Sequence, residues 1–108
     1  MEAMSRPIER DLSGIIASAA AGDDVAFGRI VAAYHGEMVR VCAVVARDQT
    51  MAEEAVQAAW SIAWRRLGSV REPDRLRSWL MSVAVNETRQ LMRKRHRRSF
   101  FFNDTATT

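Results

Sequence analysis

The residues best suited to chemistry lie in one stretch, from Arg75 to Arg98. Polar side chains recur there at three- and four-residue spacing: Ser82, Asn86, Arg89, Arg93 and Arg97. Such spacing repeats along one side of an α-helix, which turns once every 3.6 residues. The last six residues of the stretch also carry five formal positive charges. We therefore predict a long helix with one side that binds an anion.

The side chains of Asn86, Gln90, Lys94 and Trp79 indicate that this anion is nucleic acid. Asn86 and Gln90 have amide groups that can donate and accept hydrogen bonds on a base edge, and Lys94 beside them can hold a phosphate. Trp79 has a flat surface that can stack on an unpaired base, an interaction worth about 1–3 kcal/mol. The alternative for Trp79 is packing in the core beside Leu80, and partial burial would satisfy both interpretations.

The sequence gives little support for a catalytic site. His35 and His96 stand apart from any nucleophile or acid, and the glycines do not form a phosphate-binding loop. Glu53 and Glu54 are adjacent, so on a helix their side chains diverge by about 100°. One cysteine and two histidines at unrelated spacings cannot build a metal cluster. We expect a protein that is not an enzyme and has no metal or cofactor.

The whole-chain composition indicates one small, polarised domain. A chain of 108 residues with 48% apolar residues should bury roughly 60–65% of its unfolded surface, enough for one core. Cys42 has no disulfide partner, which suits a reducing cytoplasm, and no apolar run is long enough to span a membrane. Residues 65–98 hold eleven basic residues against three acidic ones, and the remainder holds five against ten. We therefore expect a polyanion at one end and a protein partner at the other.

Hydrophobic periodicity predicts an all-α fold, a compact bundle of about four helices without strands. The first helix should begin near Pro7 and stop at Gly22, and the second should be capped by Asp23 and continue to Val45. The third should begin with a capping box from Thr50 to Glu53 and end at a left-handed Gly68. A polar connector, residues 68–74, then leads into the basic helix.

The inward-facing positions expected for these helices follow the same period. They are Ile8, Leu12, Ile15, Ile16 and Ala19 in the first helix; Phe27, Ile30, Val31, Tyr34, Met38, Val41, Cys42 and Val45 in the second; Ala52, Ala55, Val56, Ala59, Trp60, Ala63 and Leu67 in the third; and Leu76, Leu80, Val83, Ala84 and Leu91 in the fourth.

Residues 99–108 do not belong to this pattern. Three consecutive phenylalanines precede a small polar run, without an amphipathic period. We expect a folded domain over residues 1–98 and an unstructured tail over 99–108. The tail resembles an adapter-derived sequence, so we expect the natural chain to continue differently beyond Arg98.

Several segments together resemble region 2 of the extracytoplasmic-function (ECF) sigma factors, in the sigma-70 family of bacterial RNA polymerase subunits. The resemblance covers about residues 8–98, in order and with suitable spacings. The segments are Gly22–Phe27, Ala52–Gln57 with Trp60, Ala63–Arg65, Trp79–Asn86 and the arginine-rich run before Ser99. Such a domain is implied to be a cytoplasmic helical bundle that acts in transcription initiation, with RNA polymerase core, partly single-stranded promoter DNA and an anti-sigma factor as partners, and without a membrane.

The resemblance also implies residue roles. The third helix would dock on the clamp helices of the beta-prime subunit, and the last helix with the preceding loop would recognise and help melt the minus-ten promoter element. The docking residues would be Glu54, Gln57, Ser61 and Arg65. The DNA-binding residues would be Trp79, Ser82, Asn86, Arg89, Gln90, Arg93, Lys94 and Arg97, with residues 69–74 receiving a flipped base. Met51 and Ala58 replace acids usual in the family, which puts the strength of docking in doubt.

Two other functions compete with this one. A stand-alone helical DNA-binding regulator would place a short recognition helix after a tight turn, whereas here the last helix is long and follows a polar loop. A non-DNA interaction module would use the basic face to bind an acidic protein or a membrane surface.

Overall fold

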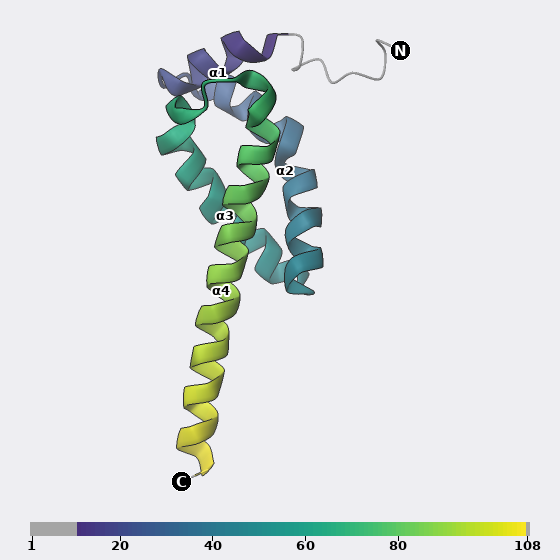
Figure 1. The fold of residues 1–108 in the computed structure, drawn as a ribbon, viewed down its shortest axis with the longest axis vertical. Coiled ribbons are helices and arrows are strands. Elements are labelled where there is room, and N and C mark those ends of the chain that lie inside the picture. Colours follow the sequence, from purple (N-terminus) through teal and green to yellow (C-terminus); the bar gives the residue numbers. More distant parts are fainter. Residues whose placement is uncertain (1–10, 108) are drawn as a thin grey trace.

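Four α-helices and two short 3-10 turns make up the fold in the computed structural model, which describes residues 11–107 and the side chains of residues 11–100 (Figure 1). In chain order they are α1 (Leu12–Ala20), α2 (Asp24–Ala46), α3 (Gln49–Arg66), η3 (Leu67–Ser69), η4 (Pro73–Arg75) and α4 (Leu76–Thr107). No strand occurs within this range, so the predicted all-α class is confirmed.

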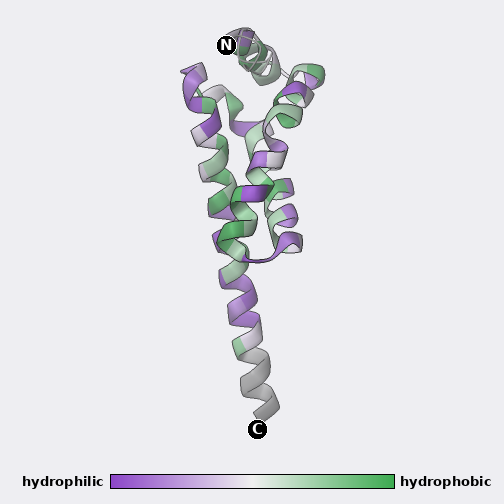
Figure 2. Cartoon of the chain, turned by 90° about the vertical axis from the view of Figure 1, so that its right-hand side faces the viewer, coloured by the Kyte–Doolittle hydropathy of each residue, from purple (hydrophilic) through white to green (hydrophobic). Residues whose placement is uncertain are grey.

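Helices α2, α3 and α4 pack against one another, and α1 lies across one end of them (Figure 1). The molecule measures 61 × 31 × 20 Å because α4 extends well beyond the bundle. Figure 2 shows α4 changing from largely hydrophobic residues inside the bundle to hydrophilic ones outside it. One helix therefore contributes both to the core and to a projecting arm.

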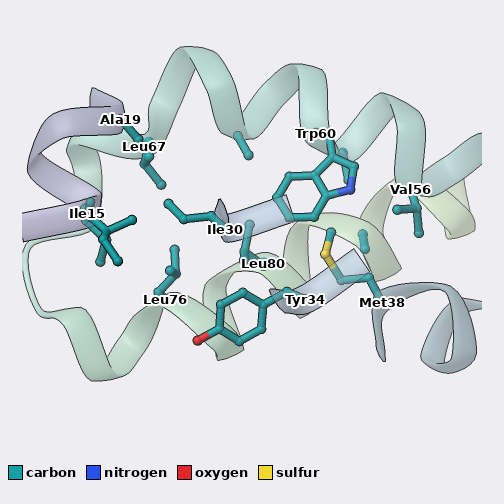
Figure 3. Packing of buried hydrophobic residues seen from close by; sticks show 14 of the residues in the cluster. Ile15, Ala19, Ile30, Tyr34, Met38, Val56, Trp60, Leu67, Leu76 and Leu80 are labelled. Carbon is teal, nitrogen blue, oxygen red and sulfur yellow. The ribbon is translucent and has the colours of Figure 1, made fainter. Parts of the chain in front are cut away.

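Side chains from all four helices meet in a single core (Figure 3). Its most fully buried large members include Ile30 and Met38 of α2, Val56 of α3 and Leu80 of α4. All seven inward positions predicted for α3 are buried, as are Ile15, Ile16 and Ala19 of α1. Burying a side chain of this size stabilises the fold by about 1.5–3 kcal/mol. The predicted start of the first helix, including Ile8, lies outside the described residues.

The periodicity also predicts the partly buried positions of α2 and α4 correctly, but it omits two buried residues, Ala26 and Thr88. Phe27 and Val31 are partly buried against the core, and so is Val83. Thr88, which the sequence pattern leaves out, has 0% of its surface exposed. Its hydroxyl donates to the carbonyl of Ala84, 2.9 Å away, and this bond allows a polar side chain inside an apolar interface.

The turn between α1 and α2 has the predicted chemistry. Gly22 adopts φ +104°, a left-handed conformation that glycine reaches without strain. The Asp23 carboxylate then accepts hydrogen bonds from the amides of Val25 (3.0 Å) and Ala26 (3.2 Å). These two bonds satisfy amide groups that the first turn of α2 would otherwise leave unpaired.

The predicted capping box at Thr50 and Glu53 is wrong. Helix α3 starts two residues earlier, because Arg47 takes a left-handed conformation (φ 55°) and ends α2 abruptly. Asp48 becomes the N-cap, and its carboxylate accepts from the amide of Met51 at 3.0 Å. An aspartate in extended backbone geometry caps a helix at least as well as a threonine.

Two further expectations differ from the structure at helix ends. Gly68 is not left-handed; α3 instead tightens into η3, where the amide of Val70 donates to the carbonyl of Leu67. Leu67 is 1% exposed, so its burial holds the chain in this turn. The unstructured tail is not observed over residues 99–107, since the backbone of α4 is helical to Thr107. No proline or glycine interrupts that segment, and adding residues to an existing helix is easier than starting one.

Candidate nucleic-acid interface and docking face

The long helix α4 presents two different sides. Its inner side carries the buried residues Leu76, Leu80, Ala84 and Thr88. Beyond Leu91 every described side chain up to Phe100 is exposed, so this part of α4 has left the core. The polar side chains on the opposite side of α4 therefore face solvent along its length.

The predicted DNA-binding residues form a continuous face on that outer side. Seven of these eight residues lie between about 100° and 180° around the helix axis from the inner side, since each residue advances by about 100°, and Lys94 lies at the edge of the face, about 60° from the inner side. Seven of them are exposed: Ser82, Asn86, Arg89, Gln90, Arg93, Lys94 and Arg97. The eighth, Trp79, is partly buried. We call these eight residues the reading face.

An open pocket of about 610 Å³ adjoins the first part of the reading face. It lies between the connector that precedes α4 and the first two turns of α4. Its lining residues are Ser69, Val70, Arg71, Glu72, Arg75, Ser78, Trp79 and Ser82. The predicted base-accepting connector is thus brought next to the tryptophan predicted to stack on a base.

Trp79 serves both the core and this pocket. Part of the indole packs on the hydrophobic core, and another part lines the pocket. The burial of Trp79 against the core agrees with the packing interpretation, and its exposed part leaves room for the predicted stacking. A ring anchored on one side and accessible on the other offers a rigid surface for stacking.

The pocket rim is polar and partly preorganised. Nε of Arg75 donates to the Glu72 carboxylate at 3.0 Å. The hydroxyl of Ser82 donates to the carbonyl of Trp79 at 2.8 Å, and that of Ser78 to the carbonyl of Arg75 at 3.2 Å. These hydroxyl hydrogens are used within α4, so the two serine oxygens face the pocket mainly as acceptors.

A second hollow, of about 490 Å³, lies further along α4. It is lined by Glu87, Gln90, Leu91, Arg93, Lys94 and Arg97. Four of the predicted DNA-binding residues therefore share one surface, where three cations surround an amide. Such a surface can hold phosphates and contact a base together.

The start of α4 is fastened to α2 by an ion pair. The guanidinium of Arg77 contacts the Glu37 carboxylate through two nitrogens, one of them Nε at 3.1 Å. Hydrogen bonding to Glu37 raises the pKa of Arg77 above its ordinary value. This contact holds the N-terminal turn of α4, and with it the connector pocket, against the bundle.

The predicted docking residues also share one exposed face. Glu54, Gln57, Ser61 and Arg65 are all exposed on α3, on the side away from the buried Val56, Ala59 and Ala63. We call these four residues the docking face. Met51 does not belong to it, because its side chain is only 4% exposed. Ala58 is partly buried at its border.

An exposed tryptophan at the end of the docking face was missed in the sequence pattern. Trp64 is 42% exposed, and its ring meets Phe27 of α2 edge to face, with 4.9 Å between centroids and 75° between planes. Phe27 also meets Trp60 at 5.7 Å and 87°. The spacing of seven residues from Gln57 to Trp64, two helical turns, was the signal that could have revealed it.

Other site types find no support in the described part of the chain. Among the side chains described, those of residues 11–100, no group of three His, Cys, Asp or Glu is placed to hold a metal ion. None of the described helices combines the length and the apolar character needed to cross a membrane.

These features define the class as an all-α bundle with an exposed helix face on α3 and a projecting basic helix. Residues 30–98 match the Sigma-70 region 2 family. That match covers more than half of the chain, and the protein therefore belongs to the Sigma-70 region 2 family.

Similar proteins carry sigma-factor names. The chain is 35% identical over 80 residues to the probable RNA polymerase sigma factor RfaY of Xanthomonas campestris pv. campestris, covering 73% of this chain and 20% of that protein. It is 33% identical over 89 residues to the RNA polymerase sigma factor CnrH of Cupriavidus metallidurans, with coverages of 82% and 46%. It is 30% identical over 86 residues to the ECF RNA polymerase sigma factor SigM of Mycobacterium tuberculosis, with coverages of 80% and 44%.

The chain thus spans less than half the length of each of these relatives. No solved structure matches the chain significantly.

Proposed function

We propose that this chain is the module of a bacterial sigma factor that binds RNA polymerase core and recognises and melts the minus-ten promoter element. Membership of the Sigma-70 region 2 family supports the proposal. The single observation that carries it further is the continuity of the reading face with the connector pocket on one side of α4. We also propose that the chain acts in the cytoplasm. An anti-sigma factor is a further proposed partner, and this proposal rests on the family alone.

DNA contact would occur in two parts. Arg93, Lys94 and Arg97 bind phosphates, which supplies affinity that falls with added salt. Asn86 and Gln90 contact base edges. Trp79 stacks on a base that has left the duplex and settles beside the connector, so that capture of unpaired bases offsets the free energy of unstacking. No covalent chemistry is required for DNA opening by this route.

Polymerase contact would occur through the docking face of α3. Gln57 and Ser61 at its centre offer uncharged hydrogen-bonding groups, and Glu54 and Arg65 place opposite charges at its two ends. The exposed ring of Trp64 extends this face with an aromatic surface, and tryptophan is enriched among the residues that contribute most to binding at protein interfaces. The two faces lie on different helices, so one domain can bind core and DNA together.

The test measures DNA binding by the 108-residue chain with and without RNA polymerase core. The probe is a forked duplex whose short single-stranded segment is randomised, and selection by the wild-type complex gives the preferred sequence. We expect enrichment of a sequence only when core is present, and we expect Asn86→Ala and Trp79→Ala to abolish the enrichment. Arg40→Gln, an exposed change on α2 away from both faces, is the matched control.

Three results would contradict the proposal in different ways. Tight sequence-specific binding by the chain alone, with preference for duplex over forked DNA, would indicate a stand-alone regulator. Core binding that is insensitive to Gln57→Ala and Glu54→Ala, together with no effect of Asn86→Ala on DNA, would indicate a different interaction module. Core binding without any enriched sequence would remove the promoter-reading role.

A further inference from the structure

The outer part of α4 is connected to the turn between α2 and α3. Nη1 of Arg95 lies 3.0 Å from Oδ2 of Asp48, a residue 47 positions earlier. At this point α4 has already left the core, since every described side chain from Met92 to Phe100 is exposed. Arg95 thus contacts the bundle from a part of α4 that has no hydrophobic packing.

Asp48 uses its two carboxylate oxygens for two different helices. Oδ1 accepts from the amide of Met51 at 3.0 Å and caps α3, while Oδ2 accepts from Arg95. The bond from the Met51 amide, with a contribution from Arg95, lowers the pKa of the Asp48 carboxyl. Asp48 therefore carries its negative charge at neutral pH in a fixed position between α3 and α4.

The position of Arg95 around α4 separates it from its basic neighbours. At about 100° per residue, Arg95 lies within about 20° of Ala84 and Thr88, the buried side of the helix. Arg93 and Arg97 lie about 160° away, on the reading face. Arg95 thus faces the bundle, although the sequence places it in the middle of a uniform basic run.

We propose that Asp48 and Arg95 form a brace that sets the direction in which the basic part of α4 leaves the bundle. Arg95 is then a positioning residue and not a phosphate contact. The expected effect of the brace on DNA binding rests on the proposed function, but the brace itself does not. Because Asp48 also caps α3, the brace connects the start of α3, which carries the docking face, to α4, which carries the reading face.

Removing this ion pair should have a modest effect, because both side chains are partly exposed to solvent. The exposed fraction is 35% for Asp48 and 57% for Arg95. An ion pair of this kind changes a population ratio by roughly two- to five-fold. A change of this size is measurable. Whether DNA binding becomes weaker or tighter distinguishes a brace from a simple charge effect.

The first measurement is amide hydrogen exchange over residues 91–98 in the chain without DNA. Asp48→Asn removes the charge but retains the cap, because asparagine caps helices as well as aspartate. We expect Asp48→Asn and Arg95→Gln each to speed exchange roughly two- to five-fold, with no further increase in the double variant. Arg95→Lys should restore most of the protection, and Arg40→Gln should change nothing. Unchanged exchange in Asp48→Asn would overturn the brace.

The second measurement is affinity for the selected forked DNA in the presence of polymerase core. With the brace, Asp48→Asn weakens binding roughly two- to five-fold; without it, removing a negative charge near the basic helix would tighten binding. Arg95→Gln should leave the slope of log affinity against log salt unchanged, whereas Arg93→Gln should lower it by about 0.7–0.9. A lowered slope in Arg95→Gln would overturn the positioning role.

The two measurements separate this inference from the proposed function. Altered exchange in Asp48→Asn with no selective DNA binding by the wild-type complex would support the brace and reject the promoter-reading role. Selective binding by the wild type, with unchanged exchange and tighter binding by Asp48→Asn, would support the function and reject the brace.

Discussion

The indole N–H of Trp60 donates a hydrogen bond to Nδ1 of His35, with 3.0 Å between the two nitrogens. The bond joins α3 to α2 directly behind the docking face, and Trp60 is 7% exposed. His35, which looks isolated in the sequence, thus supplies the partner that a nearly buried indole needs. The bond also defines the histidine tautomer, because Nδ1 must carry no proton to accept.

We predict that His35 and Trp60 are energetically coupled. His35→Leu should lower the free energy of unfolding by about 1 kcal/mol, because it leaves a nearly buried N–H without a partner. In a Trp60→Phe background, where no N–H remains, the same change should cost much less. Urea unfolding of the four chains gives the coupling energy, and equal effects of His35→Leu in both backgrounds would show that the hydrogen bond contributes nothing.

Trp64 should be an anchor of the contact with polymerase core. Truncating an aromatic residue that anchors an interface typically costs about 2 kcal/mol or more, so Trp64→Ala should raise the dissociation constant for core by about 30-fold. Trp64→Phe should lose less, because a ring can still meet Phe27. The measurement is titration of labelled chain with core.

A control separates docking from folding in that experiment. The edge-to-face contact with Phe27 is worth about 0.5–1.5 kcal/mol, so Trp64→Ala should unfold at lower urea concentration but remain folded in buffer. If affinity for core falls no more than for the exposed Val25→Ala on α2, the contact with polymerase core does not include Trp64.

Asp48 should make stability depend on pH in the acid range. Its pKa is lowered in the folded state, so its contribution is fully present above the unfolded value of about 4 and is lost as pH falls through the lower folded value. The difference in unfolding free energy between wild type and Asp48→Asn should therefore be constant above about pH 5 and shrink below about pH 4. Urea denaturation across this range measures it, and a difference that grows toward low pH would contradict the assignment.

The thiol of Cys42 should be protected from reaction in the folded chain. Cys42 is 0% exposed, and burial raises its pKa, an effect that a hydrogen bond involving Thr88 partly offsets. Since the thiolate is the reactive form, labelling by an aromatic disulfide reagent should follow opening of the bundle. The rate should rise with urea and with pH, and rapid labelling in buffer at neutral pH would show that α2 and α4 separate readily there.

The sequence predicts most of the helical framework because periodicity reports burial directly. The inner positions of α1 and α3 and the cap at Asp23 follow from residue type and spacing alone. The ends of α3 do not, because two caps compete within a few residues. The left-handed backbone at Arg47 selects Asp48 over Thr50, and such a conformation depends on how two helices must meet.

Several features of the candidate site depend on contacts between residues that lie far apart in the sequence, and the spacing of residue types does not reveal such contacts. The contacts of Trp60 with His35 and of Arg95 with Asp48 join residues 25 and 47 positions apart. Thr88 is a polar residue, yet it is buried, because its hydroxyl donates a hydrogen bond to the backbone carbonyl of Ala84, one helical turn earlier.

The amino-acid sequence by itself therefore determined that this chain is a helical bundle with one basic, amide-bearing helix, because helical spacing and charge are local properties. Only the tertiary structure decided which cations of that helix project into solvent and which, Arg77 and Arg95, contact the bundle. The physical reason is that α4 leaves the core after Leu91, and beyond that point its direction depends on contacts such as Asp48 with Arg95 rather than on hydrophobic burial.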